Sequence, residues 1–274
     1  MQVRTTTISS KNGHKITVVE DDYIGKKIAK QGIYEGCSLT FVESLLRKIR
    51  DPIVLDVGAN IGNHALDFAR YAAHVYALEP VPFTFDLLSQ NVSQNNLANV
   101  HCINKALSNK RGYETIYLTS RKNFGASSFD LRSKTAVPIR VSLETGDELV
   151  NQLGLRKVDF IKIDVEGHEL SVLQGLTGTI TNHRPLVMME WKDPLSIKRI
   201  NDADIFRILF EEHRVHVLGS NRDKAYWRGK PLANTRRRMT RLFLPKKPRL
   251  YTFDPAQEYS NILLMPNEKE DLLA

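Results

Sequence analysis

Apolar residues along this chain alternate between short strand-like runs and longer stretches with helical spacing. In the longer stretches, apolar positions recur every three to four residues. The strand and helix pairs are 53–57 with 63–71, 75–78 with 83–94, 160–163 with 168–176, and 186–190 with 197–211; a further helix is expected over 39–49 and a further strand over 100–104. Such alternation predicts parallel strands joined by crossover helices on both faces of a doubly wound α/β sheet.

The start of the chain has a different pattern, typical of antiparallel strands. Segments 3–8 and 15–19 are rich in β-formers and flank the turn dipeptide Asn12–Gly13. We therefore expect an N-terminal β-hairpin that precedes the main fold.

Composition allows a globular enzyme in a reducing compartment. A chain of 274 residues with 42% hydrophobic content is long enough to fill a core. The opening residues lack the apolar run of a signal peptide, and no segment approaches the roughly eighteen apolar residues of a membrane span. Cys37 and Cys102 lie outside any CxxC motif, as reduced buried thiols usually do. These features predict a cytoplasmic protein.

The segment VLDVGANIGNH, residues 54–64, follows the first strand of the expected sheet and resembles a nucleotide-binding loop. A dinucleotide fingerprint beginning at Gly58 would need glycines at positions 60 and 63, and both are asparagine. No lysine follows Gly62, so a phosphate-binding P-loop is excluded as well. The segment therefore argues against a nicotinamide-dependent oxidoreductase.

What remains in this segment is an acid, a glycine turn and a helix start. Backbone N–H groups of the turn and the helix N-terminus favour a carboxylate, and Asp56 favours an ammonium. A second acid, Glu79, ends the next strand, where a carboxylate can accept hydrogen bonds from both ribose hydroxyls. An amino acid joined to a ribonucleoside is S-adenosylmethionine (SAM), so these residues predict a SAM site.

With these residues in place, the sequence resembles the FkbM-type methyltransferases, a branch of the class I SAM-dependent fold. The shared stretches are GIYE (32–35), VLDVGANIGNH (54–64), ALEP (77–80), NKALSN (104–109), GASS (125–128), DFIKIDVEGHELSVLQG (159–175) and RPLVMMEW (184–191). They follow the family's order and spacing over about 32–192. The KIDVEGHE block makes the resemblance specific.

The resemblance implies a Rossmann-like, mostly parallel sheet of seven strands, closed by an antiparallel pair over 214–218 and 261–265. It also implies methyl transfer from SAM to an oxygen, usually on a sugar or natural-product acceptor. The cofactor-binding candidates are then Glu35, Asp56, Gly58, Asn60, Gly62, Glu79, Pro80 and Asn104. Ser127 and Ser128 match a serine pair expected on a loop near the acceptor.

Acids gather where the strand 160–163 ends. Methyl transfer is an in-line displacement, so a nucleophile must be held about 3 Å from the methyl carbon and lose a proton. The catalytic candidates are Asp164, Glu166, His168 and Glu190, and spacing alone does not decide which is the base. Glu166 and Glu169 could instead stabilise a helix start. Carboxylates at 56, 79, 164 and 190 could bind a divalent cation, but two are assigned to SAM and no metal is predicted.

Positive charge is concentrated in one segment near the C-terminus. The net charge is +8, yet residues 221–250 hold eleven Lys or Arg and one acid, so the remainder is slightly acidic. We interpret about 221–259 as a basic insertion in a methyltransferase domain spanning 32–274, with 1–31 as a hairpin and helix extension. The insertion favours an anionic acceptor, such as a phosphate-bearing glycan, or an acidic membrane surface. The alternative is an RNA-binding protein or RNA methyltransferase that uses 221–249.

Overall fold

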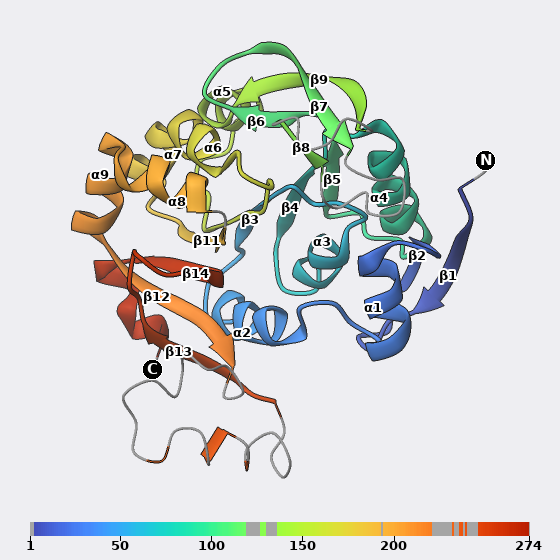
Figure 1. Cartoon of the computed structure of the whole chain (residues 1–274), viewed down its shortest axis with the longest axis horizontal. Helices are drawn as coiled ribbons and strands as arrows, with labels where there is room; N and C mark the ends of the chain where they lie inside the picture. Colours follow the sequence, from blue (N-terminus) through green and yellow to red (C-terminus); the bar gives the residue numbers. More distant parts are fainter. Residues whose placement is uncertain are drawn as a thin grey trace.

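The computed structural model in Figure 1 describes residues 3–118, 127–129, 136–192, 194–220 and 246–273, together with 232, 236, 237 and 239. Within these residues the main sheet has eight strands in the order β13-β12-β14-β11-β10-β3-β4-β5. The strands are β3 (Ile53–Val57), β4 (His74–Leu78), β5 (Val100–Ile103), β10 (Phe160–Ile163), β11 (Leu186–Trp191), β12 (His213–Ser220), β13 (Pro248–Thr252) and β14 (Tyr259–Pro266). Strands β3, β4, β5, β10 and β11 are mutually parallel, which confirms the doubly wound α/β prediction.

The C-terminal edge of the sheet corrects the expected strand count. β12 and β14 form the predicted antiparallel pair. β13 was not predicted, because it lies inside the segment interpreted as an insertion. It pairs with β12 from Ser220 opposite Pro248 to His216 opposite Thr252, and it makes the sheet eight-stranded rather than seven-stranded.

Two layers of helices cover the sheet because successive strand residues point to opposite faces. Val54 and Phe160 pack into one apolar cluster, whereas Leu55 and Ile161 pack into the other. The helices are α1 (Tyr23–Gln31), α2 (Gly36–Leu46), α3 (Asn63–Phe68), α4 (Pro82–Gln94), α5 (Gly146–Gln152), α6 (Glu169–Gly175), α7 (Thr177–His183), α8 (Pro194–Asn201) and α9 (Asp204–Glu212), followed by a 3-10 turn, η3 (Asn267–Leu273). Within the described ranges, no helix is both long enough and apolar enough to cross a lipid bilayer.

The helix expected over 197–211 is two helices, α8 and α9. Ala203 between them is extended, with φ −95° and ψ 146°. Asn201 and Asp202 precede it, and such side chains compete with helical hydrogen bonds for the backbone.

A second sheet, which the sequence pattern did not predict, lies above the carboxyl end of the main sheet (Figure 1). It comprises β6 (Ala106–Ser108), β7 (Gly112–Leu118), β8 (Ser127–Ser128) and β9 (Val137–Thr145), in the order β6-β9-β7-β8. The serine pair therefore lies in a short strand opposite Tyr117 and Leu118, rather than on a loop.

The N-terminal hairpin forms as predicted, from β1 (Thr5–Ser9) and β2 (Lys15–Val19). It docks on α4, where Asn91 exchanges two hydrogen bonds with the Thr17 backbone, at 2.7 and 3.1 Å. The Asn91 amide also donates to the carbonyl oxygen of Ile61 at 2.8 Å. One buried side chain thus ties the hairpin to the loop that follows β3.

Candidate active site

A cleft with about 1090 Å³ of free space lies at the carboxyl edge of the parallel strands. Open α/β sheets bind their ligands at this edge. Nine of the twelve predicted site residues line it: Glu35, Gly58, Asn60, Glu79, Pro80, Asp164, Glu166, His168 and Glu190. The other three, Asp56, Gly62 and Asn104, are not among the lining residues.

Gly58 brings the loop after β3 against the end of β10. Its φ is +78°, and a Cβ atom there would lie 1.9 Å from the carbonyl oxygen of Asp164. The Gly58 and Ala59 N–H groups donate to the carbonyl of Leu78 at 3.0 and 2.9 Å. Only glycine permits this contact, which joins the ends of β3, β4 and β10.

Glu79 lies at the cleft wall with both carboxylate oxygens held by the backbone. The N–H groups of Asn60 and Val81 donate to them at 3.0 and 2.9 Å. Burial nevertheless raises the pKa of Glu79 to about 7, against the effect of these two hydrogen bonds. The Asn104 amide donates to the carbonyls of Glu79 and Pro80 at 2.8 and 3.2 Å, so it braces this turn from behind.

The expected contact of Asp56 with a ligand ammonium stays a prediction, and Asp56 is not among the residues that line the cleft. Its carboxylate is fully buried and lies 3.2 Å from the ammonium of Lys162, opposite it on β10. The protein therefore supplies the cation itself. Lys162 was missed, although a lysine inside the buried run FIKI is a usable signal, because a buried charge needs a partner.

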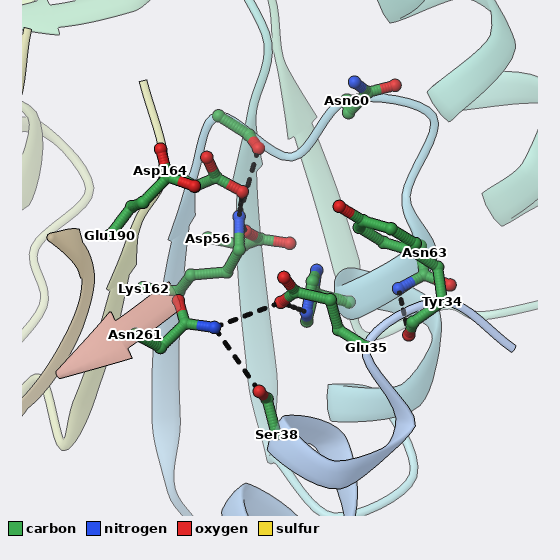
Figure 2. A network of polar contacts seen from close by, with 12 residues as sticks. Tyr34, Glu35, Ser38, Asp56, Asn60, Asn63, Lys162, Asp164, Glu190 and Asn261 are labelled. Atoms are coloured by element: carbon green, nitrogen blue, oxygen red, sulfur yellow. Dashed lines mark hydrogen bonds and ion pairs between the residues drawn. The ribbon is translucent and has the colours of Figure 1, made fainter. Parts of the chain in front are cut away.

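Glu35 presents an ionised carboxylate from the opposite wall (Figure 2). Its Oε2 lies 3.4 Å from Nε2 of His64 and accepts from the Asn261 amide at 3.3 Å. Burial alone would raise the pKa of Glu35, but His64, Lys162 and Asn261 outweigh it and lower the pKa to about 2. This carboxylate lines the cleft.

Three carboxylates face one another at the far end of the cleft. Oxygens of Asp164, Glu166 and Glu190 lie within 4.8 Å of one another, and among the described residues this is the group that could hold a metal ion. Burial, then Asp164 and Glu190, raise the pKa of Glu166 to about 7. Burial and Asp164 also raise the pKa of Glu190, against the ion pair that Lys192 makes with it.

The backbone at Glu166 is held in an unusual conformation. Its φ is +52°, a left-handed value that costs a non-glycine residue free energy, and Gly167 follows at +100°. Glu169 has different contacts from Glu166. Its buried carboxylate accepts from the Gly167 N–H at 3.0 Å and from the Ser196 hydroxyl at 2.8 Å, so it stabilises the helix start.

His168 and the second sheet close the cleft from above. The His168 ring stacks on Phe129 with centroids 4.1 Å apart, and its Nε2 lies 3.0 Å from the Ser108 hydroxyl. Phe129, just after β8, and Ile116 of β7 both line the cleft. This apolar cover comes from the sheet that the sequence pattern did not reveal.

The strand order, the glycine turn after β3 and the acids that end β4, β10 and β11 are those of a class I α/β methyltransferase. Residues 56–217 match the Methyltransferase FkbM domain, and the chain belongs to that family of methyltransferases. The resemblance found in the sequence is thereby confirmed.

Individual relatives match at modest identity. The hexuronic acid methyltransferase AglP of Haloferax volcanii is 35% identical over 130 residues, which are 47% of this chain and 52% of AglP. The 2-O-methyltransferase NoeI of Sinorhizobium fredii is 28% identical over 169 residues, 56% of this chain and 68% of NoeI. A crystal structure of a methyltransferase FkbM from Methylobacillus flagellatus is 16% identical, with a TM-score of 0.43, over 79% of this chain and 44% of that one. The match thus spans about half the length of AglP.

Proposed function

We propose that this methyltransferase transfers a methyl group from SAM to a hydroxyl oxygen of a sugar or a related polyhydroxyl acceptor. One observation carries the proposal: a single cleft joins carboxylates fixed by protein donors, Glu35 and Glu79, to a cluster of titratable carboxylates at its far end. The names of AglP and NoeI, a hexuronic acid methyltransferase and a 2-O-methyltransferase, support an oxygen acceptor of the sugar class.

The residues of the first end suit the three parts of SAM. Glu79 would accept from the ribose hydroxyls, Glu35 would meet the amino acid ammonium, and the N–H groups of the glycine turn would meet its carboxylate. Ile116 and Phe129 would cover the adenine with apolar surface. When bound, SAM supplies an electrophilic methyl group.

At the second end, Glu166 is the general base. It lines the cleft, and a pKa of about 7 lets it accept a proton near neutral pH. Asp164 and Glu190 hold the neighbouring hydroxyls of the acceptor. Glu166 takes the hydroxyl proton as the acceptor oxygen is methylated. His168 is the second candidate for the base. It ranks below Glu166 because its Nε2 already lies within hydrogen-bond distance of the Ser108 hydroxyl.

We infer that no divalent metal takes part. The ammonium of Lys192 already pairs with Glu190 beside the carboxylate cluster, where a metal would otherwise supply the positive charge. The same excess of acids favours an uncharged acceptor group in the cleft itself. The basic segment, 221–249, would bind an anionic group elsewhere on the acceptor or an acidic membrane surface. Its residues 221–231, 233–235, 238 and 240–245 lie outside the described residues. A cytoplasmic location and the division at residue 31 stay predictions.

The test is methyl transfer from labelled SAM to a panel of neutral glycosides, hexuronates and RNA, read by mass spectrometry with and without EDTA. We expect O-methylated glycoside, no labelled RNA and no effect of EDTA. Label on RNA alone would establish the alternative function. Loss of activity in EDTA, restored by Mg²⁺, would assign the carboxylate cluster to a metal.

A further inference from the structure

Lys162 lies within the polar network of Figure 2 and is among the residues that line the cleft. Its side chain is 3% exposed, and its ammonium lies 3.2 Å from Oδ1 of Asp56 and 3.5 Å from Oδ2 of Asp164. It also donates to the carbonyl oxygen of Gly58 at 3.2 Å. One hydrogen bond and two ion pairs therefore link this ammonium to three separate oxygen atoms of the protein.

The three acceptors belong to parts of the site that must keep their relative positions. Asp56 ends β3, Gly58 forms the turn after it, and Asp164 follows β10. The Gly58 carbonyl is held by Lys162 while its N–H donates to Leu78, so the turn is fixed from both sides. Because Oδ2 of Asp164 faces Lys162, its carboxylate has a defined orientation at the cleft.

The charge of Lys162 also affects the pKa values of the acids at the cofactor end. Asp56, Asp164 and Glu35 keep the pKa of Lys162 above its ordinary value although burial acts to lower it. Conversely, Lys162 lowers the pKa of Glu35 and of Glu79. Lys105 and Lys192 also line the cleft but pair with Glu144 and Glu190.

We propose that Lys162 is a positioning residue for methyl transfer: its ammonium clamps the glycine turn and Asp164 together in the geometry that receives the cofactor. The proposal rests on the SAM-dependent function proposed above. The alternative role for Lys162 is a purely structural counter-ion of Asp56. In that case both charges could be replaced by neutral groups without loss of SAM binding, because replacing a whole buried ion pair often costs no stability.

The test separates these roles with a cycle of Lys162→Met, Asp56→Asn and the double variant. Lys162→Met leaves Asp56 buried without its cation, so we expect the melting temperature of this variant to fall below that of the wild type. The double variant removes both charges and regains most of that loss. Against Asp56→Asn, we expect the double variant to bind SAM about tenfold more weakly in calorimetry, the scale of one lost charge-assisted hydrogen bond. We also expect its KM for SAM to rise more than its kcat falls.

The pH dependence of SAM binding supplies a second readout. Glu79 faces Lys162, Asp56 and the N–H groups of Asn60 and Val81, and it must be ionised to accept from both ribose hydroxyls. Affinity therefore rises with pH through the pKa of Glu79. Loss of Lys162 removes a cation that lowers this pKa, so the midpoint moves to higher pH in either Asp56 background.

The matched control is Lys157→Met, which removes a lysine that pairs with Asp159 just before β10, at the opposite edge of the sheet. It should change neither SAM affinity nor the midpoint. Equal SAM affinity in the double variant and in Asp56→Asn would overturn the positioning role and leave Lys162 a counter-ion. If wild-type protein failed to bind SAM, the proposed function itself would be wrong, and the role of Lys162 toward that cofactor would fall with it.

Discussion

The two ends of the cleft both carry carboxylates, but the partners of these carboxylates differ. At the cofactor end, Glu79 accepts two backbone N–H groups and Glu35 accepts from Asn261 and lies beside His64. At the proposed acceptor end, oxygens of Asp164, Glu166 and Glu190 lie within 4.8 Å of one another, with Lys192 paired to Glu190 and Lys162 3.5 Å from Asp164. The first end holds its carboxylates with protein hydrogen-bond donors, and the second gathers three carboxylates, of which Glu166 has a pKa of about 7.

This difference follows from what each end must do. Binding a fixed pattern of ammonium and hydroxyl groups is served by carboxylates held in place before the ligand arrives. Removing a proton is served by a carboxylate whose pKa lies near the working pH. Burial raises the pKa of both Glu79 and Glu166 to about 7. At Glu166 the neighbouring carboxylates of Asp164 and Glu190 raise the pKa further, whereas at Glu79 two backbone N–H groups oppose the effect of burial.

The sharpest way to break the comparison is Glu166→Gln, which keeps the shape but removes the proposed base. We expect kcat to fall by roughly 10²–10⁴-fold, the usual worth of a general base. The SAM dissociation constant should stay within about twofold, since the cofactor end is untouched. In wild type, kcat/KM should rise with pH through about 7, because only ionised Glu166 accepts a proton.

Glu43→Gln on α2 is the control for that measurement, because Glu43 pairs with Arg47 on the protein surface. A Glu166→Gln enzyme with near-normal turnover would clear Glu166 of the role. Glu166→Gln would then be followed by His168→Ala and Glu190→Gln, the remaining candidates for the base.

Glu79→Ala and Glu35→Ala attack the other end and should do the reverse. Each removes charge-assisted hydrogen bonds to the cofactor, which are worth about 1 to 3 kcal/mol of binding free energy. Calorimetry should show weaker SAM binding, while turnover at saturating SAM changes less. Wild-type affinity in both variants, with unchanged melting temperature, would show that SAM lies elsewhere.

A smaller effect concerns the backbone that holds the base. Because Glu166 has φ +52°, glycine should be more stable than alanine at this position, by roughly 1 kcal/mol. The free energies of unfolding of Glu166→Gly and Glu166→Ala can be compared in urea, and both should be inactive. Equal stabilities would mean that position 166 does not hold the left-handed conformation in solution.

The sequence pattern predicted the parts of this molecule that have a strict period or a motif. Parallel strands such as β3 and β10 are short apolar runs, and turn glycines such as Gly58 stand out beside them. The second sheet escaped prediction because β6 is only three residues long and β7 is partly exposed, so neither has a strong apolar pattern. β13 was hidden by the charge around it, since RLYT lies within a basic stretch.

The sequence pattern indicated the acids that follow strands and line the cleft, and it missed partners that come from distant parts of the chain. Asp56 and Lys162 are 106 positions apart and meet only through the pairing of β3 with β10. Strand register sets that contact and gives Asp56 a cation from the protein. Glu35 owes its low pKa largely to His64, in the helix after β3, and to Asn261, which lies 226 positions along the chain.

The smallest expected effect concerns the basic segment, which extends the comparison beyond the cleft. β12 runs antiparallel to β14, which runs antiparallel to β11, so Ser220 at the end of β12 lies at the carboxyl edge. Pro248, opposite Ser220, begins β13 at the same edge. The chain therefore leaves and rejoins the described sheet on the side of the cleft.

Replacing Arg236, Arg237 and Arg238 with alanine should leave SAM binding unchanged, because the described residues that line the cofactor end of the cleft come from other parts of the chain. Turnover of an acceptor that bears a phosphate or other anion should fall a few-fold at low salt and less at 0.3 M salt, where exposed charges are screened. The matched comparison is the same acceptor without its anionic group, for which wild type and variant should agree at every salt concentration. Equal turnover of the charged acceptor at low salt would remove the segment from substrate binding, and loss of RNA binding alone would point to the alternative partner.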